Sequence, residues 1–204
     1  MFIFASLNGA VERVKSDIRE ASIQGANGIE LRVDGIPGIT KEQLEELLAF
    51  QPDPNNPLSK LITIRHKDEA GPTPGGGFQR GDETERTDWY NFALKTGLVD
   101  LVDIEHLHRL PNVKVPKEVG RISSYHIFHD PFNSEYAITD MFEIMEKEAP
   151  DIIKIVAPAY TERQASYMNN AVNKLATRFR QGETQTQLVN VVNKLSNIQT
   201  TLNN

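Results

Sequence analysis

Short apolar segments alternate with longer amphipathic segments along most of the chain. The apolar segments have the length and composition of β-strands, whereas the longer segments place apolar residues at helical spacing. The pattern predicts strands at 1–7, 28–36, 60–66, 99–106, 120–128 and 151–157, and helices at 9–25, 40–50, 82–97, 136–150 and 161–182. Strands and helices that alternate in this way form a parallel sheet with helical crossovers.

Two architectures of this kind fit the chain length, an open doubly wound sheet and a (β/α) barrel. In residues 28–36, apolar Ile29 and Leu31 alternate with Glu30 and Arg32, and two further strands alternate in the same way. A closed barrel explains the polar faces, because its inner faces converge and its active site lies at the C-terminal ends of the strands. The first strand is not followed by the G-x-G-x-x-G of a dinucleotide-binding sheet. We therefore expect an α/β fold, a (β/α)8 TIM barrel, whose mouth gathers Glu30, Arg32, Arg65, Glu105, His126 and Lys154.

A lysine interrupts the predicted strand 151–157, which otherwise is typical of a strand buried on both faces. A buried, unpaired ammonium costs on the order of several kcal/mol. Lys154 is either an edge-strand residue that discourages aggregation, or an amine whose desolvation lowers its pKa so that it can form an imine. His126, at the end of the preceding strand, is either a half-buried structural residue or the proton carrier for that amine.

The other polar candidates also have two interpretations each. Arg32 and Arg65 either belong to a structural network with acidic neighbours or bind the oxygens of a polar substrate. The Pro/Gly-rich residues 69–86 lack the ending of a P-loop, which favours a lid or a plain turn. His106 and His108 have i, i+2 spacing without a convincing third ligand, so we expect no metal site there.

Composition narrows the class of protein. The chain has 204 residues, 39% of them apolar and 25% charged, which is ordinary for a single globular domain. A net charge of -6 argues against nucleic acid as a partner. The absence of cysteine fits a reducing compartment, and the apolar start at 1–7 is too short for a signal peptide or a membrane span. We expect a cytoplasmic protein without a membrane partner.

Five regions follow one another at the ends of the predicted strands: IELRVD (29–34), ITIRHKDEAG (62–71) with GDETER (81–86), VDIE (102–105), SSYHIF (123–128) and IIKIVAP (152–158). In this order they resemble the type I 3-dehydroquinate dehydratases of the shikimate pathway. The resemblance covers about residues 1–180. It implies a TIM barrel and a lyase that eliminates water from 3-dehydroquinate to give 3-dehydroshikimate in aromatic amino acid biosynthesis.

The resemblance also implies a role for each candidate residue. Lys154 would form the imine with the ketone of 3-dehydroquinate. His126 would remove a proton from the adjacent carbon and later protonate the leaving hydroxyl, and Glu105 would orient His126. Glu30, Arg32 and Arg65 would bind substrate oxygens. The chemistry needs no metal and no organic cofactor, because a protonated imine is itself an electron sink.

The last 24 residues differ in character from the rest, with nine Asn or Gln and two charged residues. We therefore expect a catalytic barrel domain at 1–180 and a polar tail at 181–204, in which residues 187–192 fit either strand seven or a helix. Nothing in the tail resembles the family's strand-seven segment or its lid after strand eight. The barrel is thus expected to be incomplete at strands seven and eight, through truncation or divergence, which would expose the edge of strand six and favour a homodimer.

Two further functions remain open at this stage. One is another imine-forming barrel, an aldolase acting on a sugar phosphate, which would need a phosphate site near strands seven and eight. The other is a non-catalytic relative that binds dehydroquinate or a protein as a sensor. Trapping of an imine with dehydroquinate would distinguish the dehydratase from both.

Overall fold

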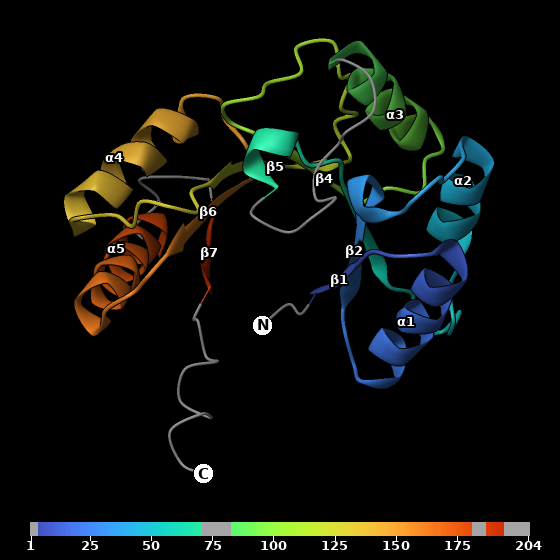
Figure 1. The fold of residues 1–204 in the computed structure, drawn as a ribbon, viewed down its shortest axis with the longest axis horizontal. Coiled ribbons are helices and arrows are strands. Elements are labelled where there is room, and N and C mark those ends of the chain that lie inside the picture. The colour runs from blue at the N-terminus through green and yellow to red at the C-terminus, as the bar shows by residue number, and fades with distance from the viewer. Residues whose placement is uncertain (1–3, 71–82, 181–186, 194–204) are drawn as a thin grey trace. The chain divides into compact units, whose positions relative to one another are not determined.

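The computed structural model describes residues 4–70, 83–180 and 187–193. The chain forms two compact units, Met1–Arg121 and Ile122–Asn204 (Figure 1). The lid or plain turn expected within 69–86 falls mostly on residues outside the described part, as do residues 1–3 of the predicted first strand and most of the polar tail. None of the described helices is long and apolar enough to cross a membrane.

The first unit is built from four parallel strands and the helices that connect them. Its strands are β1 (Phe4–Leu7), β2 (Gly28–Arg32), β3 (Ser59–Thr63) and β4 (Leu101–Glu105). Its helices are α1 (Val11–Ile23), α2 (Lys41–Ala49) and α3 (Glu83–Lys95), with 3-10 turns η1 (Val33–Gly35) and η2 (Lys67–Glu69). Each strand pairs with the next in chain order.

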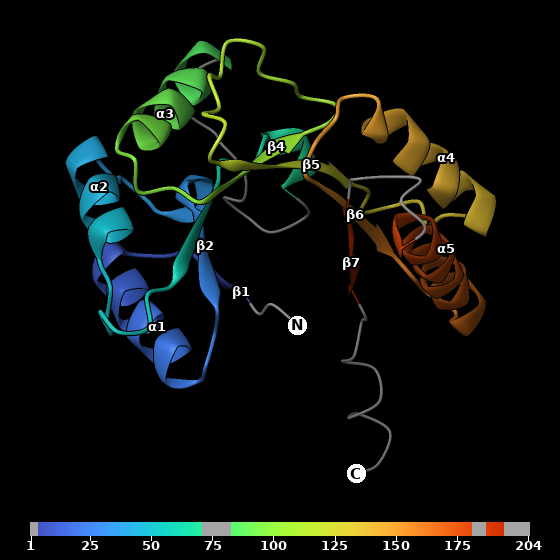
Figure 2. The same ribbon diagram turned by 180° about the vertical axis from the view of Figure 1, so that it is seen from behind.

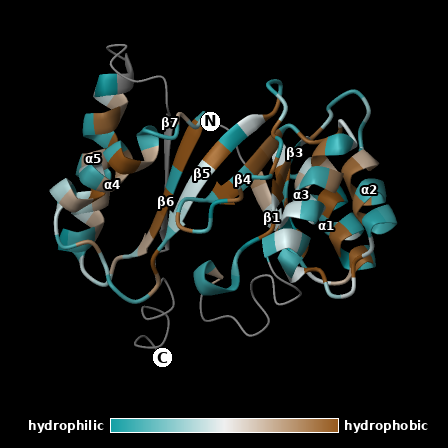
Figure 3. Ribbon diagram, turned by 90° about the horizontal axis from the view of Figure 1, so that it is seen from above, coloured by the Kyte–Doolittle hydropathy of each residue, from teal (hydrophilic) through white to brown (hydrophobic). Residues whose placement is uncertain are grey.

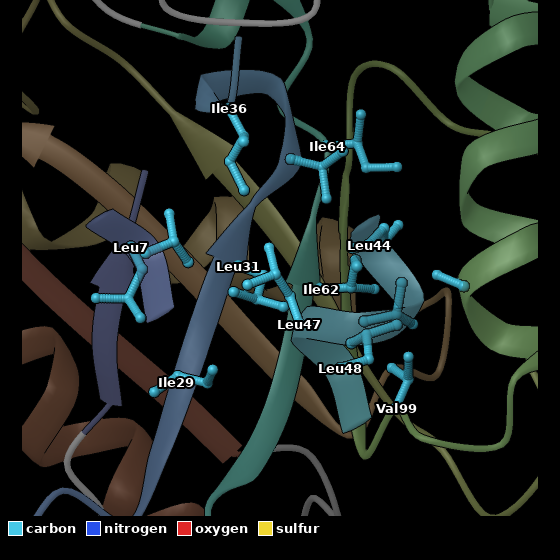
Figure 4. Close-up of a cluster of buried hydrophobic side chains, with 14 of the residues drawn as sticks. Leu7, Ile29, Leu31, Ile36, Leu44, Leu47, Leu48, Ile62, Ile64 and Val99 are labelled. Atoms are coloured by element: carbon cyan, nitrogen blue, oxygen red, sulfur yellow. The ribbon is translucent and has the colours of Figure 1, made fainter. Parts of the chain in front are cut away.

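Strand register places one apolar row across the whole first unit. Leu7 pairs with Leu31, Leu31 with Ile62, and Ile62 with Val102. All four side chains are buried, and α1, α2 and α3 cover this face of the sheet (Figures 1 and 2). Figure 4 shows Leu31 and Ile62 beside Leu44, Leu47 and Leu48 of α2. The burial of these branched side chains stabilises the unit, since each contributes about 1.5–3 kcal/mol.

Local sequence explains where two of these elements begin. Thr40 precedes α2 and forms a capping box with Gln43, so that two backbone N–H groups at the start of the helix are satisfied. Gly28 opens β2 where the chain passes closely between its neighbours. A Cβ atom there would lie 2.8 Å from the carbonyl oxygen of Ser59 and closer still to the ring of Phe4, so a larger residue would push the strands apart.

The second unit contains three parallel strands and two helices. Its strands are β5 (Gly120–His126), β6 (Ile152–Pro158) and β7 (Gln187–Asn193), and its helices are α4 (Glu135–Glu146) and α5 (Glu162–Arg180). Ile153 and Ile155 of β6 pack in one cluster with Phe142 of α4 and with Met168 and Leu175 of α5. In Figure 3 strand β6 is largely apolar, whereas the helices carry polar and apolar residues in alternation.

The tail contributes a strand to this unit. Residues 187–193 form β7, which resolves the choice between a strand and a helix in favour of the strand. β7 pairs with β6 along seven positions, from Ile152 with Gln187 to Pro158 with Asn193. The expectation that strand six has an exposed edge was therefore wrong. The apolar alternation of the tail fits both structures by itself, and pairing along an adjacent buried strand decides between them.

Candidate active site

The register of β5 and β6 places the predicted imine-forming lysine and the predicted proton carrier on one face. Ser124 of β5 is the partner of Lys154 in β6, and His126 follows Ser124 by two residues. Side chains of register partners in a parallel pair leave the sheet on the same side, and so do residues two apart on one strand. Lys154 and His126 therefore share a face, with backbone positions roughly 8 Å apart.

Lys154 lies in a sheltered but not sealed position. Its own strand face carries Val156, which is buried, and Ile152, which is half-buried, while Lys154 itself is half-buried. The opposite face, with Ile153 and Ile155, is the one that packs on α4 and α5. The prediction of full burial on both faces thus holds for the helix side alone, because Lys154 on the other side is only half-buried.

The first unit has a polar row on the face opposite its helices. Arg32 of β2 pairs in register with Thr63 of β3, and Thr63 pairs with Asp103 of β4. Thr63 is fully buried, and its hydroxyl donates to Glu30 Oε1 at 2.7 Å. This confirms the predicted division of the strands into an apolar face and a face with ionisable groups, Glu30 and Arg32 being among the latter.

Arg65, two residues beyond the end of β3, is the centre of a buried ionic network. It is 2% exposed, and its Nη2 lies 2.9 Å from Asp103 Oδ2 while its Nη1 lies 3.2 Å from Glu105 Oε1. Burial alone would lower the pKa of Arg65, but the carboxylates of Asp103 and Glu105 outweigh it and raise that pKa. The guanidinium is therefore charged and fixed in place.

Glu105 is held by donors from three directions within the first unit. Its Oε1 accepts the His66 N–H at 2.8 Å, and its Oε2 accepts from Arg86 Nη2 at 2.6 Å. Burial raises the pKa of Glu105 above its ordinary value, although Arg65 and Arg86 act in the opposite direction. The carboxylate thus braces Arg65, His66 and helix α3 against the end of β4.

Arg32 is the more accessible of the two predicted substrate-binding arginines. Its guanidinium makes two hydrogen bonds to the buried carboxylate of Asp34, at 3.0 and 2.6 Å, and 23% of its side chain is exposed. Asp34 also accepts the backbone N–H of Arg65 at 3.1 Å. Asp34 therefore links the ends of β2 and β3 and holds Arg32 in a fixed direction.

Sequence reasoning missed several buried polar residues near these strand ends. Arg86 is 1% exposed although it lies in the polar run GDETER, and Tyr90 is fully buried with its hydroxyl 2.6 Å from the Asp103 carbonyl. Glu69 is 3% exposed in η2. The helical spacing of Arg86 and Tyr90 on one side of α3 was the available signal, because residues four apart share a helix face.

The described residues contain one group with the spacing of metal ligands, formed by His66, Asp68 and His108. The pair for which the sequence predicted no metal site, His106 and His108, is not this group: His106 is 8% exposed and belongs to the buried residues. Burial and the neighbouring His108 ring lower the pKa of His66. This group lies in the first unit, after β3 and β4.

Parallel strands with covering helices, and ionisable side chains at the strand ends, define the class of the protein as an α/β enzyme fold of the barrel type. A family model, Type I 3-dehydroquinase, matches residues 3–184. The chain belongs to the type I 3-dehydroquinase family, which places it in the shikimate pathway as a hydro-lyase acting on 3-dehydroquinate. No relative was found among curated proteins.

Solved structures share the fold. A type I 3-dehydroquinate dehydratase from Clostridium difficile matches with a TM-score of 0.77 at 21% identity, over 93% of this chain and 74% of that one. The enzyme from Geobacillus kaustophilus matches with 0.74 at 18%, over 94% and 73%, and that from Enterococcus faecalis with 0.74 at 16%, over 95% and 80%. The predicted α/β barrel is confirmed, and it is incomplete in the described residues, which supply seven strands where a whole barrel has eight.

Proposed function

We propose that this protein dehydrates 3-dehydroquinate through an imine formed on Lys154. The observation that carries the proposal is the register of β5 and β6, which presents Lys154 and His126 on one face at a spacing that a small substrate can bridge. Membership of the type I 3-dehydroquinase family supplies the reaction. The half-buried position of Lys154 supports the proposal, since a substrate cannot reach a fully buried lysine.

The proposed reaction begins with attack of Lys154 Nζ on the substrate ketone, followed by loss of the ketone oxygen as water. The resulting protonated imine withdraws electrons from the neighbouring carbon, so His126 can remove a proton there and leave an enamine. The enamine electrons then expel the hydroxyl group from the next carbon, and His126 returns its proton to that hydroxyl as it leaves as water. Hydrolysis of the imine releases the product and regenerates Lys154.

The polar row of the first unit is proposed to bind the substrate oxygens. Arg32 can donate from its exposed part while Asp34 fixes its direction. Glu30 is 9% exposed and accepts the Thr63 hydroxyl, and it is proposed as an acceptor for a substrate hydroxyl. Arg65 already forms ion pairs with Asp103 and Glu105. One of these ion pairs must therefore break before Arg65 can contact the substrate as proposed. The orientation of His126 by Glu105 stays a proposal from the family resemblance.

The proposed organisation is a catalytic domain at 1–180 followed by the polar tail at 181–204, and the match of the family model to residues 3–184 supports it. We further propose that the protein acts in the cytoplasm as a homodimer, with 3-dehydroquinate as its small-molecule partner and without nucleic acid. The absence of cysteine supports the cytoplasmic location, and the net charge of -6 supports a protein that does not bind nucleic acid. Light scattering at several protein concentrations tests the dimer.

Reductive trapping tests the function directly. The full chain is incubated with 3-dehydroquinate and sodium borohydride, and its intact mass is measured beside a turnover assay that follows the enone product by absorbance. We expect one covalent adduct per chain together with turnover. An adduct without turnover would indicate a non-catalytic binding protein. Turnover without any adduct would exclude the imine, and neither adduct nor turnover would exclude the dehydratase.

A further inference from the structure

A histidine pair stacks next to the proposed substrate-binding residues. The rings of His66 and His108 lie with centroids 3.6 Å apart and planes 13° from parallel. Asp68 completes a group whose ligand atoms, one from each residue, all lie within 4.8 Å of one another. His66 follows Arg65 after β3, Asp68 lies in η2, and His108 follows β4 by three residues. Parallel neighbouring strands thus bring together ligands that are 42 residues apart in the sequence.

The hydrogen bonds of His66 indicate which nitrogen carries its lone pair. Nδ1 accepts the backbone N–H of Asp68 at 3.2 Å, and Nε2 lies 3.2 Å from Glu83 Oε1. A neutral imidazole with these neighbours has its proton on Nε2, facing the carboxylate, and its lone pair on Nδ1, so an ion bound at Nδ1 replaces the Asp68 N–H as the partner of that lone pair. Metal-binding histidines characteristically have a carboxylate on the nitrogen that does not bind the ion, because it fixes the tautomer and the ring direction.

The spacing of the candidate ligand atoms suits a tetrahedral ion. Two ligand atoms that each lie about 2.1 Å from such an ion are roughly 3.4 Å apart. His66 Nδ1 lies 3.6 Å from Asp68 Oδ2, close to that separation. A ligating nitrogen points at the ion within its own ring plane, so binding must turn the two imidazoles out of their parallel stack. Asp68 has 62% of its side chain exposed and leaves the site open to solvent.

Hydrogen bonds hold the segments that carry His66 and His108 close together. The backbone N–H of His66 donates to the buried Glu105. Glu83, the carboxylate behind His66, is 3.1 Å from Arg86 Nη1, and Arg86 is in turn anchored on the carbonyl oxygen of His108 at 3.1 Å. One buried arginine therefore positions both histidines of the pair. Because these contacts already hold the two segments together, binding an ion costs less entropy than joining free segments, although the two rings must still turn.

We propose that His66, His108 and Asp68 form a binding site for a divalent transition-metal ion such as Zn²⁺, with Glu83 supporting His66 from behind. Two imidazoles and one carboxylate favour Zn²⁺, Ni²⁺ or Cu²⁺ over Mg²⁺ and Ca²⁺, which prefer oxygen ligands alone. Solvent supplies the fourth position. The ion links η2 to the segment after β4 and takes no part in the proposed dehydration. The test of the metal site is therefore independent of the test of that function.

The sequence gives little sign of this site. In the sequence the nearest histidine to His108 is His106, two residues earlier, and no third ligand stands near these two. Its real neighbour, His66, lies after a different strand, and Asp68 is one of many acidic residues in a chain with 28 of them. The close approach of these residues follows from the pairing of β3 with β4.

Calorimetric titration of the full chain with zinc sulfate, in parallel with magnesium chloride, tests the site. We expect one Zn²⁺ per chain and no heat from Mg²⁺. The variants Asp68→Asn and His108→Ala should bind at least about tenfold more weakly, and Glu83→Gln about 10- to 100-fold more weakly. Circular dichroism confirms that each variant is folded. The exposed His129 in the second unit offers a matched control, and His129→Ala should bind as the wild type does.

Cobalt provides an independent readout of geometry. Co²⁺ bound by two imidazoles and a carboxylate in a tetrahedral site should give an intense visible absorption band, which Asp68→Asn and His108→Ala should weaken. The proposal is overturned if Zn²⁺ does not bind, if Mg²⁺ binds equally well, or if His129→Ala loses as much affinity as His108→Ala. The exposed Asp68→Asn keeps the test decisive even where His108→Ala fails to fold.

Discussion

Ser124 and Lys154 are register partners in neighbouring parallel strands, and their side chains leave the sheet on the same face. Ser124 is fully buried, whereas Lys154 is half-buried, so the lysine has a small polar neighbour on its β5 side. A bulkier residue at position 124 would compete with the lysine for space. The backbone register, rather than a flexible loop, thus sets where the amine lies relative to His126.

The first prediction concerns the site of the covalent adduct. After borohydride trapping with 3-dehydroquinate and digestion with trypsin, the label should appear on Lys154. Because a modified lysine resists trypsin, the labelled peptide should span residues 148–163. Lys154→Arg should give no adduct while keeping the charge of the side chain. A label on Lys60, or on any other lysine, would contradict the assignment.

The second prediction separates imine formation from proton transfer. His126→Ala should still form the trapped adduct, because Lys154 is unchanged, but its turnover should fall by at least about 10²-fold. Steady-state kinetics and intact mass measure the two effects on the same sample. The neighbouring exposed histidine provides the control, and His129→Ala should keep wild-type turnover. Unchanged turnover in His126→Ala would return His126 to a structural role.

The third prediction concerns the buried network around Glu105. Glu105→Gln keeps the shape but leaves the guanidinium groups of Arg65 and Arg86 with less compensating charge. Breaking a buried ion pair costs about 3–5 kcal/mol, so the free energy of unfolding in urea should fall by that order. Glu46→Gln removes the exposed partner of Lys15 and should change the free energy of unfolding little, because solvent screens that pair. Equal effects of the two variants would show that the buried network adds no stability.

The fourth prediction uses the buried amine of Lys60. Its side chain is 1% exposed and donates to the Phe50 carbonyl at 2.8 Å. Burial lowers the pKa of Lys60 to about 8, despite the opposing charge of Asp100. Between that value and the ordinary value of 10.5, the unfolded chain holds the proton and the folded chain does not, so raising the pH favours the folded state.

Urea unfolding at pH 7.5 and pH 9.5 measures this effect. The free energy of unfolding of the wild type should gain about 1–2 kcal/mol over that interval relative to Lys60→Met, in which the group is absent. Other titrating groups cancel in the comparison. A pH dependence that is the same in both proteins would show that Lys60 keeps its proton when folded.

The alternation of residues along the strands was enough to predict the two faces of the first unit. Ile29 and Leu31 are fully buried toward the helices, and Glu30 and Arg32 lie on the polar face, as the sequence indicates. Strand ends were predicted less well. The strand expected at 60–66 ends at Thr63, because Arg65 and the residues after it turn toward side-chain acceptors such as Asp34 instead of continuing the ladder.

The network at the strand ends could not be predicted, because it depends on contacts between distant segments. Arg86 lies in a run of polar residues that is typical of an exposed helix start, yet it is buried on Glu105, 19 residues away. Lys60 likewise appears in the sequence as a polar residue at the start of a strand. In the structure it is buried, and its amine donates to the backbone carbonyl oxygen of Phe50. Such residues are recognised only once their partners are placed, since a charge is buried where compensating groups surround it.

The order of strand pairing has a consequence for how the protein forms. Within the two units, register partners are separated by 24 positions for Phe4 with Gly28 and by 40 for Leu61 with Leu101, and the other pairings inside the units fall between these. The entropy of closing a loop depends weakly on its length, so the closure costs of these pairings differ by only about 0.5 kcal/mol. Loop length therefore favours none of these pairings over another as the chain emerges from the ribosome. We expect the order of strand pairing to depend instead on how much apolar side-chain surface each connecting helix covers.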